Sequence, residues 1–559
     1  MHCEHELVPG LYWIGGDDHR TPLFEGHHPV PHGMAYNNYL LLDEKTVLFD
    51  TIDRAVEERF LETVEHLLDG RPLDYIVINH MEPDHSATLG AVAARHPEAA
   101  LVCTATAKQM VKQFFGPDLA ERVHVVDDGD TLDTGARTLT FLKAPMVHWP
   151  EVMVTYDADD RILLSADAFG SFGALDGRLF DSDYDFDAEL LDENRRYYAN
   201  IVGKYGTQVT DLLDKLDGHD VDLICPLHGP LVRDNITRLI GLYRTWAAYR
   251  PEDAGVVIAY ASIYGGTRDV AEKLAFKLSD RGVNDLALFD VSVTDPSYIL
   301  SEAFRVGTVV LASVTYNAGV FPKMQEFIEA MAAHNLRHRR FAIIQNGSWG
   351  PIAGRLMTKA VEAIPDSTIV GDMLTIKSRM TDAQEPDLDA LADAIAAAVR
   401  SEDGERADAA GETAVDDAAA AGVAAGAAGV AGTAAAPGAD PTGTVSASPA
   451  GRTGAAPAPS ANRASAAATP ADGRTGTASA PAGNRSGAAA VPLTPPPARD
   501  LPPVPGAANT KVMQVWRCTF CGYQAEVPKG TDMSTFVCPI CFHSGEGRFV
   551  LVREKVVPA

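Results

Sequence analysis

The sequence predicts a multidomain protein of α/β and α+β architecture, and three observations lead to this prediction. From Glu6 to about Arg250, short strands mix with helical segments, which indicates two sheets covered by helices. After Arg250 the pattern becomes a regular β-α-β alternation, typical of a doubly wound parallel sheet. An Ala-, Gly- and Pro-rich stretch then precedes a short module with two Cys-x-x-Cys pairs. The expected parts are domains at 1–250, 254–400 and 511–559, with a disordered linker at 401–510.

Composition narrows the class of protein. The chain has 559 residues, room for about three or four domains. Its net charge of −29 argues against a nucleic-acid surface. The first residues lack a basic and then apolar signal sequence, and the uncharged run 418–439 contains no Leu, Ile or Phe. We therefore expect a cytoplasmic protein that binds neither nucleic acid nor membrane.

The N-terminal elements follow from hydrophobic patterning. A hairpin is expected at Tyr39–Leu42 and Thr46–Phe49, an amphipathic helix at Arg54–Leu68, a strand at Tyr75–Asn79 and a helix at Ser86–Arg95, capped near Asp84 to Ser86. Further strands are expected at Leu101–Cys103, Val123–Val126, Thr138–Leu142, Val152–Tyr156 and Ile162–Ser165.

Four metal-ligand side chains follow the strand at Tyr75. They are His80, Glu82, Asp84 and His85. Side chains two positions apart do not share a helix face, so the spacing predicts a loop at the carboxyl end of a strand. A polar turn is the plain alternative, but so many ligand-type residues in six positions differ from ordinary turn composition. The loop therefore predicts a metal site.

Three further candidates occur just beyond strands. His148, Asp167 and His228 are each followed by small or turn-forming residues. Each alone would more often be a polar loop or core residue. Together with the loop they give four histidines and three carboxylates, enough for two metals.

His80-x-Glu82-x-Asp84-His85, followed by His148, Asp167 and His228, resembles the metallo-β-lactamase-like domain of flavodiiron proteins. The resemblance implies an αββα fold with a non-haem diiron centre. It implies that His80, Glu82 and His148 bind one iron, that Asp84, His85 and His228 bind the other, and that Asp167 bridges them. The hydrolases of this superfamily carry histidine where Glu82 stands, and a carboxylate there shifts preference from zinc towards iron or manganese. Water can displace a ligand such as His85 in such families. His27, His28 and His32 lie in a Pro/Gly-rich loop and are weaker candidates for lining the same pocket.

Three loops of the second domain form a candidate ligand site. A strand at Val256–Tyr260 and a helix at Arg268–Leu278 flank the first loop, while strands at Val309–Ala312 and Phe341–Gln345 precede the others. The first loop offers backbone N–H groups and hydroxyls to a phosphate, although it is not the dinucleotide motif GxGxxG. Tyr316 and Trp349 could flank a flat ring; alternatively, both could cap the sheet core. The candidate residues are Ser262, Ile263, Tyr264, Gly265, Gly266, Thr267, Ser313, Val314, Thr315, Tyr316, Asn317, Gly319, Asn346, Gly347, Ser348, Trp349 and Gly350. The three loops resemble those that bind FMN in flavodoxin, and a flavodoxin domain directly after the diiron domain is the flavodiiron arrangement.

The linker and the cysteine module complete the chain. If residues 401–510 form a flexible coil, their root-mean-square span is about 60 Å. Cys518/Cys521 and Cys538/Cys541 predict a tetrahedral four-thiolate site, while Cys3, Cys103 and Cys225 are expected to be ordinary thiols, the latter two buried in strands. Cys-x-x-Cys-Gly-Tyr and Cys-Pro-x-Cys resemble rubredoxin, which implies one iron. The interval between the pairs is shorter than in ordinary rubredoxins, and Phe542 replaces a usual glycine. A zinc ribbon stays open as the alternative.

Taken together, the resemblances imply a flavodiiron oxidoreductase that reduces O₂ to water, NO to N₂O, or both. Electrons would pass from the rubredoxin-like iron through FMN to the diiron pair. They imply an NAD(P)H-dependent reductase as donor and a head-to-tail homodimer or dimer of dimers. Two alternatives are a zinc hydrolase of the metallo-β-lactamase superfamily with fused electron-transfer modules and a non-catalytic electron shuttle.

Overall fold

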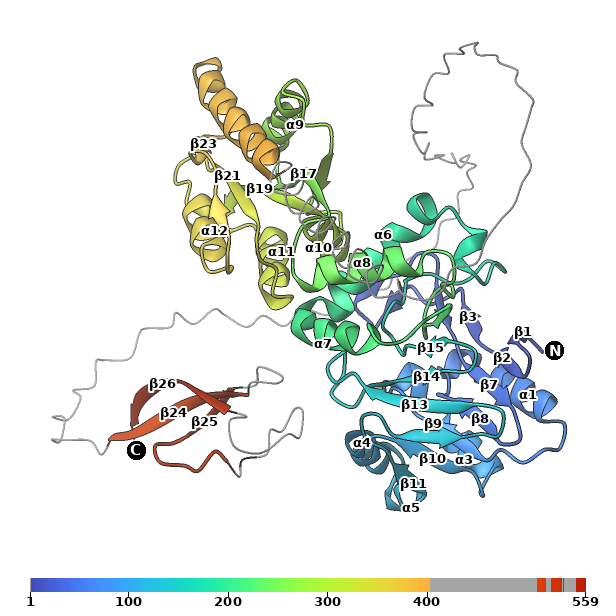
Figure 1. The fold of residues 1–559 in the computed structure, drawn as a ribbon. Coiled ribbons are helices and arrows are strands. Elements are labelled where there is room, and N and C mark those ends of the chain that lie inside the picture. Colours follow the sequence, from blue (N-terminus) through green and yellow to red (C-terminus); the bar gives the residue numbers. More distant parts are fainter. Residues whose placement is uncertain (1, 403–509, 519–523, 535, 537–548, 559) are drawn as a thin grey trace, which may run out of the picture. The chain divides into compact units, whose positions relative to one another are not determined.

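The computed structural model describes residues 2–402, 510–518, 524–534, 536 and 549–558 (Figure 1). Its N-terminal domain contains two sheets. The first has the order β1-β2-β7-β8-β9-β10-β11 and the second the order β12-β13-β14-β15-β16. The strands of the first sheet are β1 His5–Val8, β2 Leu11–Trp13, β7 Tyr39–Leu42, β8 Thr46–Phe49, β9 Tyr75–Val77, β10 Ala100–Cys103 and β11 Val123–Val125. Those of the second are β12 Thr131–Asp133, β13 Thr138–Lys143, β14 Met153–Asp157, β15 Ile162–Leu164 and β16 Leu223–Cys225. Two small pairs, β3 Gly16–Asp18 with β6 Met34–Tyr36 and β4 Leu23–Phe24 with β5 His28–Pro29, lie outside these sheets.

The two sheets pack face to face over one apolar core. Leu41, Val47 and Val77 of the first sheet share a buried cluster with Phe141 and Leu164 of the second. Helices cover the outer faces (Figure 1). This arrangement confirms the predicted αββα sandwich. The helices are α1 Glu57–Leu68, α2 Pro83–Ser86, α3 Leu89–Arg95, α4 Ala105–Phe115, α5 Pro117–Glu121, α6 Leu191–Tyr197, α7 Gly206–Leu216 and α8 Ile236–Ala247.

The hairpin of β7 and β8 is confirmed to the residue, and Cys103 and Cys225 are buried in strands as expected. Two predicted elements are wrong in detail. The strand that begins at Tyr75 ends at Val77, because the Asn79 N–H donates to Asp50 Oδ1 at 2.7 Å instead of continuing the sheet. The single helix expected at Ser86–Arg95 is two helices, α2 and α3. Proline is favoured in the first turn of a helix, so Pro83 starts a helical turn inside the ligand segment. The Thr88 hydroxyl then donates to Ile52 O at 2.8 Å, in the break before α3.

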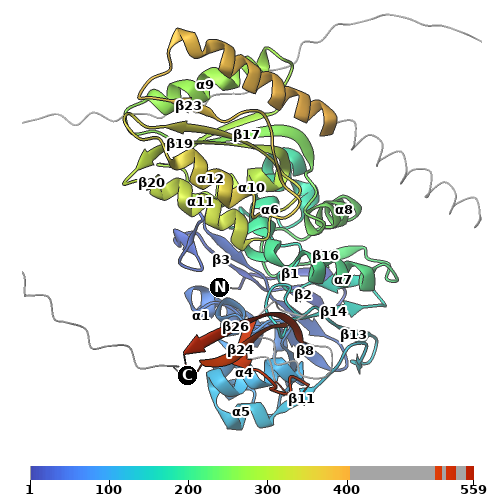
Figure 2. The same cartoon turned by 90° about the vertical axis from the view of Figure 1, so that its left-hand side faces the viewer.

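The second domain is a parallel sheet between two helix layers. The strand order is β18-β17-β19-β21-β22, with β23 also paired to β21. Figure 2 shows α9 and the helix at residues 385–402 on one face and α10, α11 and α12 on the other. The central strands are buried on both faces, which explains their continuous apolar runs. The doubly wound prediction is confirmed. The elements are β17 Asp253–Ala261, α9 Gly266–Ser279, β18 Leu286–Asp290, α10 Pro296–Arg305, β19 Val306–Tyr316, β20 Gly319–Val320, α11 Pro322–Ala333, β21 Arg340–Asn346, α12 Ala353–Val361, β22 Thr368–Ile369 and β23 Leu374–Ile376.

The expected loop at Ser313–Gly319 is mostly strand. β19 extends to Tyr316 and pairs with the antiparallel β20, so that Tyr316 lies opposite Gly319. The turn is only Asn317 and Ala318, with φ of 48° and 57°. The strand can extend because a tight hairpin supplies the hydrogen-bond partners that a parallel neighbour would otherwise provide.

A ladder of ion pairs joins α9 to the helix at 385–402. Lys277 Nζ lies 2.8 Å from Asp389 Oδ1, and Arg281 Nε lies 2.6 Å from Asp393 Oδ1. Lys273 pairs with Glu385 one turn earlier. Spacing of four residues on both helices places successive pairs on facing sides.

The described part of the C-terminal module is a three-stranded sheet of order β25-β24-β26. Its strands are β24 Thr510–Cys518, β25 Gln524–Pro528 and β26 Phe549–Pro558. Cys518 is buried in a small cluster with Ala525 and Phe549. Cys521, Cys538, Cys541 and Phe542 lie outside the described residues, as does the linker from residue 403 to 509. The four-cysteine site therefore stays a prediction. Among the residues that the structure describes, no helix is long and apolar enough to span a bilayer.

Candidate metal centre

A buried carboxylate fixes the ligand loop after β9. Asp50 follows β8 with φ of 56°, and its Oδ1 accepts from the backbone N–H groups of Asn79 at 2.7 Å and His80 at 3.0 Å. Its Oδ2 accepts from the Asn79 side chain at 2.9 Å. Burial raises the pKa of Asp50 to about 6, although these hydrogen bonds favour the charged form. The loop that begins at His80 is thus held by its backbone. His80 and Glu82 lie in this loop, while Asp84 and His85 lie in the short helix α2, which loop spacing alone did not predict.

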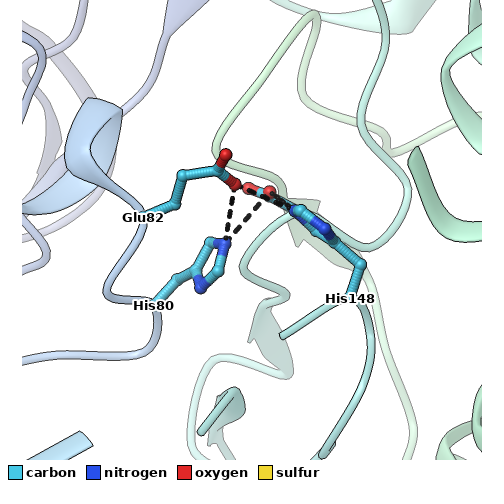
Figure 3. A group of neighbouring side chains, drawn as sticks. His80, Glu82 and His148 are labelled. Carbon is cyan, nitrogen blue, oxygen red and sulfur yellow. Dashed lines mark hydrogen bonds and ion pairs between the residues drawn. The ribbon is translucent and has the colours of Figure 1, made fainter. Parts of the chain in front are cut away.

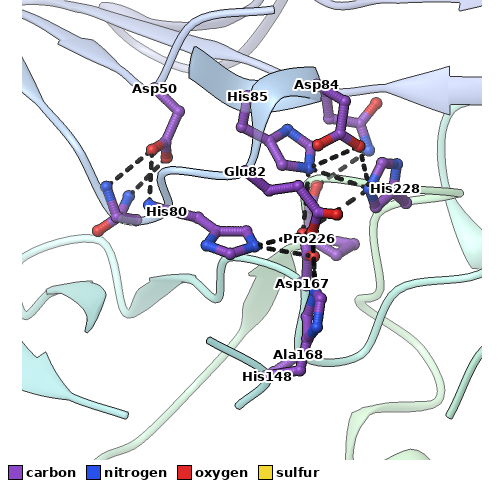
Figure 4. Close-up of polar contacts among 12 residues, drawn as sticks. Asp50, His80, Glu82, Asp84, His85, His148, Asp167, Ala168, Pro226 and His228 are labelled. Carbon is purple, nitrogen blue, oxygen red and sulfur yellow. Dashed lines mark hydrogen bonds and ion pairs between the residues drawn. The ribbon is translucent and has the colours of Figure 1, made fainter. Parts of the chain in front are cut away.

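The other three candidates reach the same place from the second sheet. His148 lies in the loop between β13 and β14, Asp167 follows β15, and His228 follows β16. The residue before Asp167 has a positive φ, 51° at Ala166, which is uncommon for a residue with a side chain. All seven side chains converge in Figure 4. The predicted donors therefore form one buried site, although they come from both sheets.

His80, Glu82, His148 and Asp167 form the first ligand group, whose ligand atoms lie within 4.8 Å of one another. His148 Nε2 is 3.0 Å from Glu82 Oε2 and 3.0 Å from Asp167 Oδ2. His80 Nε2 is 3.3 Å from Glu82 Oε2 and 3.4 Å from Asp167 Oδ2 (Figure 3).

Asp84, His85 and His228 form the second ligand group. Both Nε2 atoms lie 3.3 Å from Asp84 Oδ2 and 3.0 Å from each other. Asp167 reaches this group too, because its Oδ1 is 3.2 Å from His85 Nε2. One carboxylate therefore touches the first group through Oδ2 and the second through Oδ1.

The protonation pattern fits cations between these donors. His80 Nδ1 hydrogen-bonds to Glu151 Oε1 at 2.8 Å, and His228 Nδ1 hydrogen-bonds to Ala35 O at 2.8 Å. Carboxylate and carbonyl oxygens only accept, so each Nδ1 carries a proton and Nε2 is the nitrogen directed at the other donors of the site. His80 Nε2 faces the carboxylates of Glu82 and Asp167, and His85 Nε2 faces His228 Nε2, so these nitrogens point at positions that a cation could occupy. Both oxygens of Asp84 are also buried without a hydrogen-bond partner among the described residues.

Electrostatics favour the anionic form of Asp167. Burial opposes ionisation of Asp167, yet neighbouring His80 and His85 hold its pKa well below the usual value. Burial likewise disfavours charge on His148, but hydrogen bonds to Asp167 and Glu82 raise its pKa to about 10. Imidazole and carboxylate donors in this proportion suit iron, manganese or zinc.

Aromatic side chains surround the second group. The rings of Phe24, Tyr36 and Tyr197 have centroids 5.2, 5.7 and 5.6 Å from that of His228. Asp50, Glu151 and Tyr197 were missed from the sequence. Glu151 comes three residues after His148, which is the only local signal for it. The two ligand groups do not include His27, His28 or His32.

A second candidate site lies where the parallel strands of the second domain end. Gly265 has φ of 91°, and its N–H donates to Ser262 Oγ at 3.1 Å, which shapes the turn before α9. A Cβ at Gly266 would lie 2.0 Å from Ser378 O. Asn346 donates to Thr267 Oγ1 at 3.2 Å and accepts from the Ser378 N–H at 2.9 Å. The first and third predicted loops therefore meet, joined by a segment at Ser378 that the sequence did not reveal.

The aromatic residues of this site do not cap the core. Tyr264 is 98% exposed, Trp349 96% and Tyr316 42%, so the core-capping alternative is wrong. Their faces are available to a planar ligand. Thr315 has a different contact, since its Oγ1 accepts from the Ile352 N–H at 2.9 Å and the Ala353 N–H at 3.1 Å at the start of α12.

Comparison with known proteins gives matches over most of the chain. The family model described as ODP family beta lactamase matches residues 34–229, a range that contains all seven candidate ligands. The anaerobic nitric oxide reductase flavorubredoxin of Salmonella arizonae is 34% identical over 388 residues, which are 68% of this chain and 78% of that protein.

Solved structures extend the comparison. The rubredoxin oxygen:oxidoreductase from Desulfovibrio gigas has a TM-score of 0.68 and 28% identity, covering 72% of this chain and 99% of its own. The flavodiiron protein from Giardia intestinalis has a TM-score of 0.64 and 25% identity with the same coverage. The match to a curated relative over more than two thirds of its length shows the family: this chain belongs to the flavodiiron proteins.

Proposed function

We propose that this protein is an oxidoreductase that reduces O₂ to water, NO to N₂O, or both, at two non-haem irons. The observation that carries the proposal is Asp167, whose two oxygens contact two separate groups of buried imidazole and carboxylate donors. Relatives named for nitric oxide reduction and for rubredoxin:oxygen oxidoreduction support both gases. A zinc hydrolase is not favoured, because Glu82 places a carboxylate where those enzymes have an imidazole.

In this proposal each ligand group holds one iron. His80, Glu82 and His148 would hold the first, Asp84, His85 and His228 would hold the second, and Asp167 would contribute to both. Three carboxylates and one hydroxide would balance the four positive charges of two ferrous ions, so the buried site can be close to neutral. When bound, the irons supply electrons and adjacent binding positions for one small substrate.

FMN fits the second candidate site. Backbone N–H groups at the start of α9, around Gly265 and Gly266, suit its phosphate. The exposed rings of Tyr264, Tyr316 and Trp349 suit its flat ring system. The contributing residues are those predicted at 262–267, 313–317, 319 and 346–350. FMN accepts electrons singly and holds two, which matches one-electron supply to multi-electron gas reduction.

The remaining parts of the proposal concern electron supply. Cys518, Cys521, Cys538 and Cys541 would hold one rubredoxin-type iron. The chain has no nicotinamide-binding motif of the GxGxxG type after Val256–Tyr260, so the upstream donor would be an NAD(P)H-dependent flavoprotein reductase. A head-to-tail homodimer, alone or paired into a tetramer, would bring the FMN of one chain to the diiron site of the other.

The protein's own side chains orient and enclose the reaction. Asp50 and Asn79 fix the backbone of the ligand loop, and the aromatic ring of Tyr197 closes one side of the second group. All seven ligands are buried, which limits water access and escape of partly reduced products.

Metal and flavin analysis with gas consumption tests the proposal. The purified protein should contain about two irons bound by residues 1–402 and one FMN. After anaerobic reduction, O₂ and NO are added in separate experiments, and each gas that is a substrate should reoxidise the flavin and the irons. D167N should abolish gas consumption and leave the flavin absorption spectrum unchanged. D157N removes a buried carboxylate at the far end of β14 and should retain activity. Two zincs with esterase or lactamase turnover would support the hydrolase, and bound flavin without gas consumption would support an electron shuttle.

A further inference from the structure

Glu151 is a buried carboxylate behind one ligand of the metal centre. It lies between His148 and β14, and its side chain is fully buried. Its Oε1 accepts from His80 Nδ1 at 2.8 Å and from the Met81 N–H at 2.8 Å. The Thr104 hydroxyl donates to its backbone oxygen at 2.9 Å. Its Oε2 is buried without a hydrogen-bond partner among the described residues, so the described side-chain hydrogen bonds of Glu151 all go to His80 and Met81.

Among the described residues, no carboxylate hydrogen-bonds to the Nδ1 of a histidine in the second ligand group. His228 Nδ1 donates to a neutral backbone carbonyl, that of Ala35. His85 Nδ1 is buried without a partner in the part of the chain that the structure describes. Of these three imidazoles, only His80 hydrogen-bonds to a carboxylate through Nδ1. The two halves of an otherwise similar site therefore differ in the charge behind their ligands.

We propose that Glu151 is a positioning residue that holds His80 Nε2 towards the first iron and lowers the reduction potential of that iron relative to the second. This inference rests on the proposed diiron function. A carboxylate bonded to the far nitrogen of a histidine fixes its tautomer and ring orientation and increases its donor strength. The same negative charge, in a water-poor interior, favours the ferric over the ferrous ion. Glu151 would therefore favour the ferric state at the iron held by His80, Glu82 and His148.

E151Q separates charge from hydrogen bonding. The amide oxygen of glutamine can still accept from His80 and Met81, while the negative charge is lost. We expect about two irons per diiron site to be retained. At a fixed solution potential, we expect the ferric/ferrous ratio at the iron near His80 to fall about tenfold. This corresponds to a rise of about 59 mV in the reduction potential of that iron. The electron paramagnetic resonance signal of the half-reduced centre should change, and the FMN potentials should not.

D157N is the matched control. Asp157 is also buried in this domain, where it accepts from the backbone N–H groups of Asp159 at 3.0 Å and Asp160 at 3.3 Å. It lies at the opposite end of β14, about 13 Å along the strand from Met153 at roughly 3.3 Å per residue. Losing this charge should leave both iron potentials unchanged.

Several outcomes decide the question. A rise in one iron potential in E151Q, with two irons retained in the diiron site, supports the role of Glu151. Two unchanged potentials with full iron content overturn it, as does an equal rise in D157N. If E151Q does not fold, E151D is measured instead, because it keeps the negative charge but places it farther from His80. The proposal then predicts a smaller rise, confined to the reduction potential of one iron. A wild-type protein without two irons would refute the proposed function itself, which separates that failure from this one.

Discussion

Replacing Asn37 tests how the loop that carries His228 is held. Asn37 is fully buried; its Oδ1 accepts from Trp13 Nε1 at 2.8 Å, and its Nδ2 donates to Pro226 O at 3.0 Å and Gly229 O at 2.8 Å. N37L keeps a similar volume and removes all three hydrogen bonds. The substitution should both destabilise the domain and loosen His228.

The magnitude follows from the groups that are left unpaired. Pro226 O still accepts from the Tyr39 hydroxyl at 2.7 Å, so only the Trp13 N–H and Gly229 O lose their side-chain partner. At about 1–3 kcal/mol for each buried unpaired group, the free energy of unfolding should fall by about 2–6 kcal/mol. Looser placement of a metal ligand should weaken iron binding at the second group by about 10–100-fold.

Y39F is the graded control, because Pro226 O keeps its bond from Asn37 and only about 0.5–1.5 kcal/mol should be lost. Urea unfolding followed by circular dichroism measures stability, and iron titration of the folded protein measures affinity. The reasoning fails if N37L is no less stable than Y39F, or if N37L binds two irons as tightly as the wild type.

Three further predictions concern single residues. G266A should abolish FMN binding, measured by flavin fluorescence titration, because its Cβ would collide with Ser378 O. G241A, in α8, has no atom within 4 Å of its Cβ and should bind FMN normally; equal binding by both variants would contradict this account. Burial lowers the pKa of His28 to about 4, and like charges nearby, His27 first among them, add to this shift. The unfolded chain then binds more protons between pH 4 and about 6.5, so stability is complete above that range and falls with decreasing pH by up to about 3 kcal/mol. H28Q should remove this slope relative to the wild type in urea titrations, and parallel curves would refute the assignment. R339M should cost about 3 kcal/mol or more, because the buried guanidinium donates to five backbone carbonyls, and a loss below 1 kcal/mol would show that water replaces it.

The sequence correctly predicted those helices and strands whose hydrophobic pattern lies within their own residues. The hairpin of β7 and β8 follows from two short apolar runs separated by a short polar turn, and the parallel sheet follows from regular apolar runs. The break between α2 and α3 escaped because the Thr88 contact comes from Ile52, far away in the chain. The extension of β19 to Tyr316 depends on a two-residue partner strand that is too short to be predicted.

The candidate site shows the same division. The seven predicted donors lie together in two groups, since each has a recognisable residue type and follows a strand in the sequence, Asp84 and His85 by way of the short helix α2. Asp50, Glu151 and Ser378 carry no such mark, because their importance comes from groups brought close only by folding. Asp50 lies 30 positions from His80, and Glu151 lies 71 positions from it.

The ladder between α9 and the helix at 385–402 has a mechanical consequence. Residue 402 of that helix is the last described residue before the segment that precedes the cysteine module in the sequence. Lys273, Lys277 and Arg281 of α9 form ion pairs with this helix at three successive turns. A force along the helix would therefore have to break several ion pairs together. We expect these ion pairs to limit how far such a force displaces the turn at Gly265 and Gly266, at the other end of α9. Concentrated salt should weaken the ion pairs and so reduce this effect.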